Sequence, residues 1–210
     1  VTLNGQATTT RVAMRSSSNG TQWNLTSTGT QSVSNADVRD SSACGGDTID
    51  ASDGTNLDST NNSCWDINFV TLSISDTALG FGTLSTTATR WANGDATSSG
   101  GSATDVAAHT ISITSNARSG YALTYKGATL TSGSDTVDVA TIANDADGTQ
   151  GSEQFAMNFD KTTGNAKIAG GYDNDDGPDW NFVASTTTTV VSESSSTSIE
   201  TIEARYLTNI

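Results

Sequence analysis

The stretch Ser198–Ile210, "SIETIEARYLTNI", decides the fold class of this chain. Ile202, Ala204 and Tyr206 fall on one face of an extended backbone, and polar or charged residues alternate with them on the other face. Successive side chains of a β-strand point to opposite faces, so this period of two predicts a half-buried strand. No turn or further strand follows it, and the first question is therefore where its partner lies.

Shorter runs of the same kind recur between turn-rich links such as "NDADGTQG" and "DNDDGPD". Gly, Asn and Asp supply the backbone conformations that tight turns need, and no helical stripe interrupts the pattern. About eight to eleven short strands with such links predict an all-β fold, an antiparallel β-sandwich of the Ig-like or jelly-roll-like kind. The clearest runs are residues 109–114, 121–125, 154–159 and 180–184.

One run, "INFVTLSIS" at residues 67–75, changes face partway along its length. Ile67 shares one side with Phe69. Val70, Leu72 and Ile74 share the other. A bulge or a switch between sheets would reconcile the two halves. We therefore expect a boundary near residue 70, with an N-terminal extended arm (1–10), a β arm with a disulfide loop (11–69) and a main sandwich (70–210).

Composition limits the classes of partner. Of 210 residues, 33% are hydrophobic and nearly a third are Ser or Thr, which predicts a thin core. The formal charge of −14 argues against nucleic acid, which needs a basic surface, and against an anionic membrane surface. No apolar run approaches the length of a membrane-spanning helix, so we expect no membrane insertion.

Cys44 and Cys64 frame a loop rich in Asp, Asn, Ser, Thr and Gly. In an exported protein two such cysteines predict a disulfide, and two thiols with no nearby histidine do not make a zinc site. The chain opens at Val1 without a basic and then apolar leader. This is typical of a secreted protein after removal of its signal peptide, or of an excised fragment. We expect an extracellular or cell-surface location.

Four segments carry a resemblance to a known group of proteins. They are "TLSISDTALGFGTLSTTATRW", "AHTISITSNARSGYALTYKGATLTSG", "GSEQFAMNF" and "IEARYLTNI". Over roughly residues 70–210 the chain resembles the Ser/Thr-rich secreted surface proteins common in ultrasmall candidate-phyla bacteria. The resemblance implies an exported β-sandwich without catalytic residues. It also implies a Gly-containing turn and one more apolar strand after "YLTNI", which this sequence lacks.

A sandwich that lacks its final strand leaves an open groove, here lined by Ile202, Ala204 and Tyr206. Donor-strand complementation fills such a groove with an extended segment from another subunit, and a head-to-tail contact of this kind builds filaments. The N-terminus suits the donor role, because one face of its alternating pattern carries Val1, Leu3, Gly5 and Ala7. Two alternatives stay open: this segment pairs within its own domain, or the missing strand lies outside this chain.

Acidic turns suggest calcium, since hard cations prefer several carboxylate and carbonyl oxygens. Neither of two candidate loops matches the EF-hand pattern, and solvated acidic turns are the alternative. The candidate ligands are Asp145 and Asp147 in one loop and Asp173, Asp175, Asp176 and Asp179 in the other.

Catalytic chemistry has little support in the sequence. His109 is the only histidine, and it lies in phase with Ile111 and Ile113, which indicates a structural role. No nucleophile elbow, metalloprotease motif or phosphate loop occurs, and we do not expect an enzyme.

These observations predict a structural subunit of an extracellular filament, a pilus or a surface layer, assembled from copies of itself by donor-strand complementation. The alternative is a cell-surface adhesin or carbohydrate-binding module with a glycan or another cell-surface partner. Such a module would present exposed aromatic rings, and Trp65, Trp91 and Trp180 border turn-rich stretches.

Overall fold

The computed structural model describes residues 1–94, 100–117, 119–174 and 178–210, and no helix occurs among them. The chain forms two compact units. Unit 1 comprises Val1–Thr71 with Ser115–Ser119, and unit 2 comprises Leu72–Thr114 with Gly120–Ile210. The division falls within strand β11 (Val70–Ile74) and at the last residue of strand β13 (His109–Ser115).

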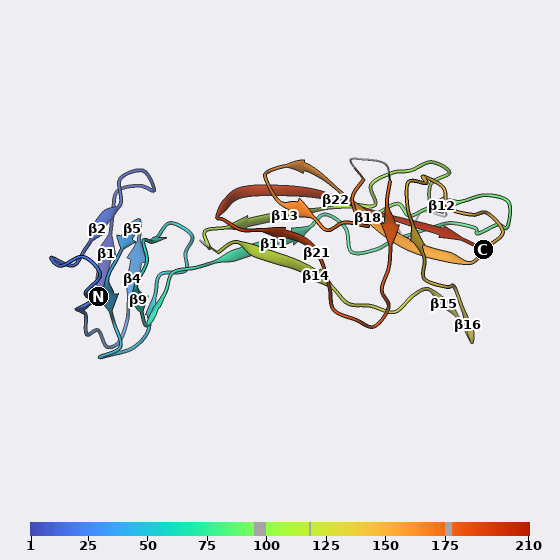
Figure 1. Ribbon diagram of the computed structural model, residues 1–210. Coiled ribbons are helices and arrows are strands. Elements are labelled where there is room, and N and C mark those ends of the chain that lie inside the picture. Colours follow the sequence, from blue (N-terminus) through green and yellow to red (C-terminus); the bar gives the residue numbers. More distant parts are fainter. Residues whose placement is uncertain (95–99, 118, 175–177) are drawn as a thin grey trace. The chain divides into compact units, whose positions relative to one another are not determined.

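Unit 1 is a stack of short strands, and β1 to β10 pair with one another in parallel (Figure 1). The chain winds through three coils, so each strand pairs with the strand of the next coil, as in a β-solenoid. The first coil holds β1 (Thr2–Asn4), β2 (Val12–Met14) and β3 (Trp23–Asn24). The second holds β4 (Ser32–Ser34), β5 (Ala36–Val38), β6 (Ser41–Ser42) and β7 (Ile49–Asp50), and the third holds β8 (Leu57–Asp58), β9 (Asn62–Ser63) and β10 (Trp65–Asp66).

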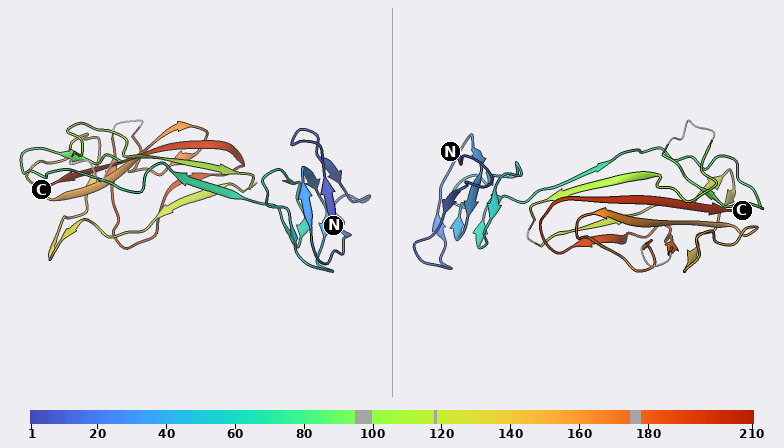
Figure 2. Two further views of the ribbon diagram at one scale, coloured as in Figure 1. Left: turned by 180° about the vertical axis from the view of Figure 1, so that it is seen from behind. Right: turned by 90° about the horizontal axis from the view of Figure 1, so that it is seen from above.

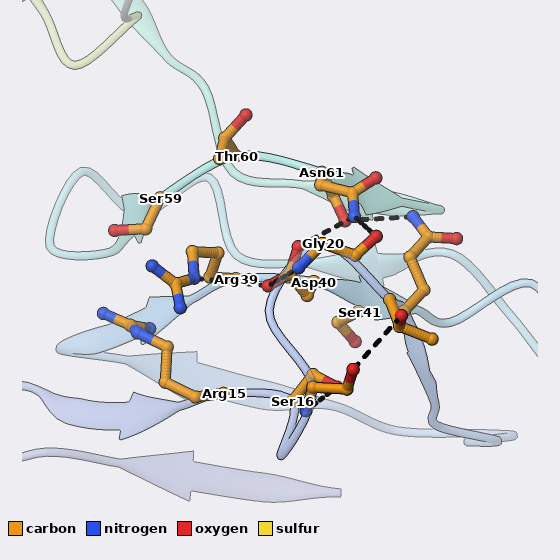
Figure 3. Close-up of polar contacts among 12 residues, drawn as sticks. Arg15, Ser16, Gly20, Arg39, Asp40, Ser41, Ser59, Thr60 and Asn61 are labelled. Atoms are coloured by element: carbon orange, nitrogen blue, oxygen red, sulfur yellow. Dashed lines mark hydrogen bonds and ion pairs between the residues drawn. The ribbon is translucent and has the colours of Figure 1, made fainter.

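One corner of the solenoid shows how the coils are tied together. Gly20, Asp40 and Asn61 occupy this corner in successive coils, each with a positive φ that lets the chain turn sharply. The Asp40 carboxylate accepts hydrogen bonds from the Gly20 N–H (3.1 Å) and from the Asn61 side-chain amide (2.8 Å) (Figure 3). These hydrogen bonds, with that from Asn61 the largest effect, lower the pKa of Asp40, so one ionised carboxylate joins three coils.

The parallel pairing in unit 1 adds to the sequence prediction, which described residues 11–69 only as a β arm. Short alternating runs do not reveal whether the next strand returns in a hairpin or continues around a coil. Buried aliphatic side chains fill the interior of the stack. They are Val33, Ala36, Val38, Ala43, Ile49, Ala51 and Ile67.

Unit 2 is the predicted antiparallel sandwich. Its larger sheet has the order β11-β13-β22-β18-β20-β17, with β12 (Arg90–Trp91) pairing the end of β22. The strands are β22 (Thr197–Asn209), β18 (Gln154–Thr163), β20 (Trp180–Asn181) and β17 (Thr141–Ile142). The other sheet has the order β14-β21-β19, formed by β14 (Tyr121–Tyr125), β21 (Thr188–Glu193) and β19 (Lys167–Ile168). A small hairpin joins β15 (Thr131–Ser132) to β16 (Asp135–Thr136).

The closing strand β22 has neighbours on both sides. β18 pairs with it from Gln154 opposite Asn209 to Thr163 opposite Thr201, and β13 lies along its other edge (Figure 2). Ile202 and Ala204 are fully buried in the core between the sheets. The partners of the last strand therefore lie earlier in the chain.

Candidate functional site: the open edge of the sandwich

The expected acceptor groove does not lie at β22. An incoming strand finds no free edge there, because β13 and β18 flank β22. Ile202 and Ala204 are covered by the chain's own side chains. The half-buried Tyr206 places its hydroxyl 3.2 Å from His109 Nε2, and burial raises the pKa of this hydroxyl to about 12. The prediction placed the open edge at the wrong strand, because it assumed that the last strand in sequence is also last in the sheet.

The expected donor segment pairs within its own unit. β1 lies parallel to β4, with Leu3 opposite Val33 and packed against the core of unit 1. Leu3, Gly5 and Ala7 form the less exposed face, as the alternation indicates, whereas Val1 is exposed. A Cβ on Gly5 would overlap the carbonyl oxygen of Asn35. The close backbone approach expected at Gly5 therefore occurs, but against its own chain.

A free sheet edge does exist at β11, which ends the larger sheet in the described chain. Two backbone hydrogen bonds fix its register: Ser75 N–H donates to the Thr110 carbonyl (2.9 Å), and Asn116 N–H donates to the Phe69 carbonyl (3.3 Å). The residue number on β13 falls as that on β11 rises, so the two strands are antiparallel. The backbone groups of Leu72 and Ile74 therefore point to the free side of β11.

This register also assigns the faces of β11. Leu72 lies opposite Ile113, and Ile74 lies opposite Ile111, and residues directly opposite share a face of the sheet. Ile111 and Ile113 are buried in the sandwich core. Leu72 and Ile74 continue this core face, yet they are 49% and 42% exposed. The apolar face of the sheet thus extends onto the edge strand β11, and no described residue covers this strand.

Topology explains the exposure of this edge. The connections from β13 to β14, from β18 to β19 and from β21 to β22 are among those that cross between the sheets. The larger sheet has the order β11-β13-β22-β18-β20-β17, whereas the other sheet has only β14-β21-β19, so not every strand of the larger sheet has a counterpart. β11 is the end strand of the larger sheet, beyond β13. We call Leu72, Ile74 and the adjacent free edges of β11 and β14 the open edge.

Neither strand of the open edge carries an ionisable acid or base other than tyrosine. Tyr121, Leu123 and Tyr125 of β14 are only partly buried where they pack against the core. Burial raises the pKa of Tyr121 to about 12, so its hydroxyl is neutral at physiological pH. The open edge can therefore offer unpaired backbone groups and apolar surface, but no group suited to acid–base or nucleophilic chemistry at neutral pH.

Sequence reasoning assigned Leu72 and Ile74 to one face but did not single out their strand. The change of face within residues 67–75 was the available signal. Ile67 is buried in the core of unit 1, whereas Leu72 and Ile74 belong to the sandwich. The switch marks the passage of the chain from one core to another.

The cysteine prediction is confirmed, because Cys44 and Cys64 form a disulfide between the second and third coils. His109 has a structural environment: its Nδ1 lies 3.1 Å from the Asp76 carbonyl oxygen and its Nε2 faces Tyr206. Burial lowers the pKa of His109, although the Asp76 contact opposes this. The lowered pKa favours the neutral form of the imidazole.

The two acidic loops named as calcium candidates come together. The Asn144 N–H donates to Asp179 Oδ1 (3.0 Å), and within its own loop Asp145 Oδ1 accepts from the Asp147 N–H (3.0 Å). Asp173 belongs to the same arrangement, because its carbonyl accepts the Asp179 N–H. Among the described residues no group of three or more His, Cys, Asp or Glu side chains could hold a metal. Asp175 and Asp176 lie outside the described residues, so calcium stays a prediction.

The tryptophans proposed for carbohydrate binding are poorly placed for it. Trp91 and Trp180 are buried, at 4% and 0% exposure. Trp65 is half-buried, and its indole N–H donates to the Ser41 hydroxyl (3.0 Å). A sugar ring stacks on an exposed aromatic face, and neither Trp91 nor Trp180 provides one.

Comparison with known proteins adds no assignment. No protein-family model, curated protein or solved structure matches this chain. In the described residues, no helix is both long and apolar enough to span a bilayer. The function therefore has to be argued from the geometry of the open edge.

Proposed function

We propose that this chain is a structural subunit of an extracellular filament or surface layer, built from copies of itself by strand pairing at the open edge. One observation carries the proposal: Leu72 and Ile74 continue the core face of the sandwich onto a free edge strand. A free, apolar strand edge is a template for another strand, and natural monomers usually block it with charges, proline or a covering segment. β11 has no charge or proline.

A second copy is the occupant that the charge distribution favours. Each copy carries −14, so copies repel one another over most of their surface. Association is least opposed where carboxylates are few, and the strands of the open edge contain none. An added strand gains backbone hydrogen bonds along β11, and its apolar side chains cover Leu72 and Ile74.

The added strand is best supplied by the edge of another folded sandwich. Release of the N-terminal segment would break the pairing of β1 with β4 and withdraw Leu3 from the core of unit 1. Two sandwiches meeting at their β11 edges keep both units intact. We therefore propose that copies pair through the β11 edges of their folded sandwiches, and not through donation of the N-terminal segment. This contact is two-fold, so a filament or layer also needs a second contact between copies.

Export fits this proposal. A disulfide persists in oxidising compartments, and the Cys44–Cys64 bond joins two coils of a small unit with few core side chains. A high content of Ser and Thr with an acidic surface favours solubility outside the cell.

The test replaces Leu72 by Lys in the full chain. A lysine on the core face of an edge strand places a charge where the incoming strand would bury it, and strand pairing is then disfavoured. Leu72 is 49% exposed in the single chain, so we expect the variant to fold. Electron microscopy and light scattering should show that extended polymers are lost.

The matched control is Ser73→Lys, which adds the same charge on the opposite, exposed face of β11. It should assemble as the original chain does. Polymers of unchanged length from Leu72→Lys would contradict the role of the open edge. A wild-type protein that stays monomeric at all concentrations would contradict self-assembly altogether.

A further inference from the structure

The free edge of β11 differs from two other end strands of the sandwich. At the opposite end of the larger sheet, β17 has only two residues, and Asp145 and Asp147 follow it. In the smaller sheet, the end strand β19 also has two residues and carries Lys167. Short strands and charges are common protections against pairing with another chain. β11 has five residues and no charge, so an incoming strand can pair along its whole length.

Hydrogen bonds to β13 divide the backbone of β11 into two sets. The odd-numbered residues face β13, because the Phe69 carbonyl accepts the Asn116 N–H (3.3 Å) and the Ser75 N–H donates to the Thr110 carbonyl (2.9 Å). Backbone groups alternate in direction along a strand, so the even-numbered residues point to the free side. These residues are Val70, Leu72 and Ile74.

The same three residues carry the exposed apolar side chains of β11. Val70 is 53% exposed, and Leu72 and Ile74 are 49% and 42% exposed. Residues two apart in a strand share a face, so all three side chains lie on the core face of the sheet. Thr71 and Ser73 lie on the opposite face. Free backbone groups and uncovered apolar side chains therefore occur at the same residues.

We propose that two copies pair antiparallel along β11, with Leu72 of one copy opposite the partner's Leu72. This inference rests on the proposed function, because it describes how two copies meet at the open edge. A contact between identical surfaces has a two-fold axis, which here passes between the two leucines. Val70 then lies opposite the partner's Ile74, and Thr71 lies opposite the partner's Ser73.

The length of β11 favours this register. With the axis at Leu72, all five residues from Val70 to Ile74 lie opposite a residue of the partner strand. With the axis at Thr71 or at Ser73, two residues of each β11 lose their opposite residue. A shift by one residue would turn the apolar side chains of the partner to the other face of the sheet. The register centred on Leu72 therefore gives the most backbone pairing and joins the two core faces.

The side chains that meet in this register are of the same kind. Leu72 contacts the partner's Leu72 on the core face, and cross-strand apolar pairs of this type stabilise a sheet. Asp76, the first charged residue after β11, lies beyond the paired length. With the axis at Ser73, Asp76 would instead lie opposite the partner's Val70. The proposed register thus keeps carboxylates out of the contact between two negatively charged copies.

Amide hydrogen exchange locates the axis in the unaltered protein. The amides of Val70, Leu72 and Ile74 should exchange fast in dilute solution, and all three should slow at least tenfold on association. An axis at Thr71 would leave Ile74 unprotected, and an axis at Ser73 would leave Val70 unprotected. Either pattern would overturn the register and leave the proposed function in place.

Cysteine cross-linking tests the register by distance. Thr71 and the partner's Ser73 form a pair without mutual backbone hydrogen bonds, and the Cα atoms of such a pair are about 4.5 Å apart, which suits a disulfide. A mixture of Thr71→Cys and Ser73→Cys proteins should therefore cross-link under mild oxidation. Each variant alone is the control and should cross-link at least tenfold more slowly, because the diagonal Cα separation is about 7–8 Å. Cys44 and Cys64 are bonded to each other.

The outcomes separate this inference from the proposed function. Fastest cross-linking of Thr71→Cys alone, or of Ser73→Cys alone, would place the axis at that residue and overturn only the register. Adding Leu72→Lys to both proteins should abolish cross-linking of the mixture, because two lysines would then face each other. No cross-linking in any sample, with unchanged exchange along β11 in a protein that does associate, would overturn the proposed function as well.

Discussion

At the scale of single residues, Glu200 shows how one buried carboxylate organises the sandwich. It is fully buried, and it accepts hydrogen bonds from the backbone N–H groups of Asn165 (3.0 Å) and Ala166 (3.2 Å). A Cβ on Gly164 would overlap this carboxylate, so the turn after β18 needs a glycine there. Glu200 thereby fastens the connection from β18 to β19.

Replacing Glu200 by Ala should therefore destabilise the protein. The buried Ala166 N–H and the partly buried Asn165 N–H lose their acceptor. An unsatisfied buried donor costs about 1–3 kcal/mol and a partly buried one costs less, so the free energy of unfolding should fall by about 2–4 kcal/mol. Glu203→Ala is the control, because Glu203 lies on the other face of β22, where it pairs with Arg205. Loss of a partly exposed ion pair should cost about 1 kcal/mol or less. Urea unfolding of both variants checks the difference, and equal losses would contradict this role.

Part of this residue-scale detail could be predicted from the sequence. Glu200 is in phase with Ile202 and Ala204, so the period of two already places it on the core face. Its acceptor role could not be predicted, because the donors come from a turn 35 residues earlier. Gly5 is similar: its need for close approach was predictable, but its neighbour Asn35 was not.

At the scale of strands, the length of each strand determined whether the sequence could predict it. The expected runs at 109–114, 121–125 and 154–159 correspond to β13, β14 and β18, because several alternating residues give a clear period. Strands of unit 1 have only two or three residues, too few for a period. Parallel stacking also depends on contacts between coils, such as the Asp40 corner, which no local pattern reveals.

The order of strands in the sheet was not predictable either. Sequence reasoning placed an open edge at the last strand, whereas β22 is an inner strand and β11 is the edge. Strand order depends on the connections that cross between the sheets, and each crossing is set by long-range packing rather than by the local pattern. The free edge of this sheet therefore lies at β11, two strands away from β22.

The disulfide acts on the scale of one element, the pair of coils that it joins. Cys44 and Cys64 are 20 residues apart, and closing a loop of this size stabilises by about 3 kcal/mol in the chain-entropy model. The double variant Cys44→Ser, Cys64→Ser should therefore lower the stability of unit 1 by about that amount. Amide exchange should accelerate in the second and third coils and stay unchanged in β18 and β22.

Adding a reductant to the wild-type protein should reproduce this effect, and adding it to the double variant should change nothing further. Faster exchange throughout the sandwich would contradict the assignment of the disulfide to unit 1 alone. Unchanged exchange in the coils would show that packing, and not the covalent link, holds the solenoid together.

At the scale of the whole molecule, the negative net charge opposes association between copies. The chain carries −14, yet the strands of the open edge contain no carboxylate: β11 and β14 have none. Attraction at this edge comes from backbone pairing and apolar burial, whereas the remaining surface repels. Because the attractive contacts and the repelling charges lie on different parts of the surface, the direction in which salt changes assembly can be predicted.

Raising the salt concentration should therefore strengthen assembly. Between about 0.01 M and 0.15 M the screening length falls from about 30 Å to about 8 Å, which weakens repulsion between copies while apolar contacts persist. Light scattering at both salt concentrations should show association beginning at a lower protein concentration in the higher salt. Association that weakens with salt would mean that ion pairs hold the copies together, and the open edge would then be the wrong contact.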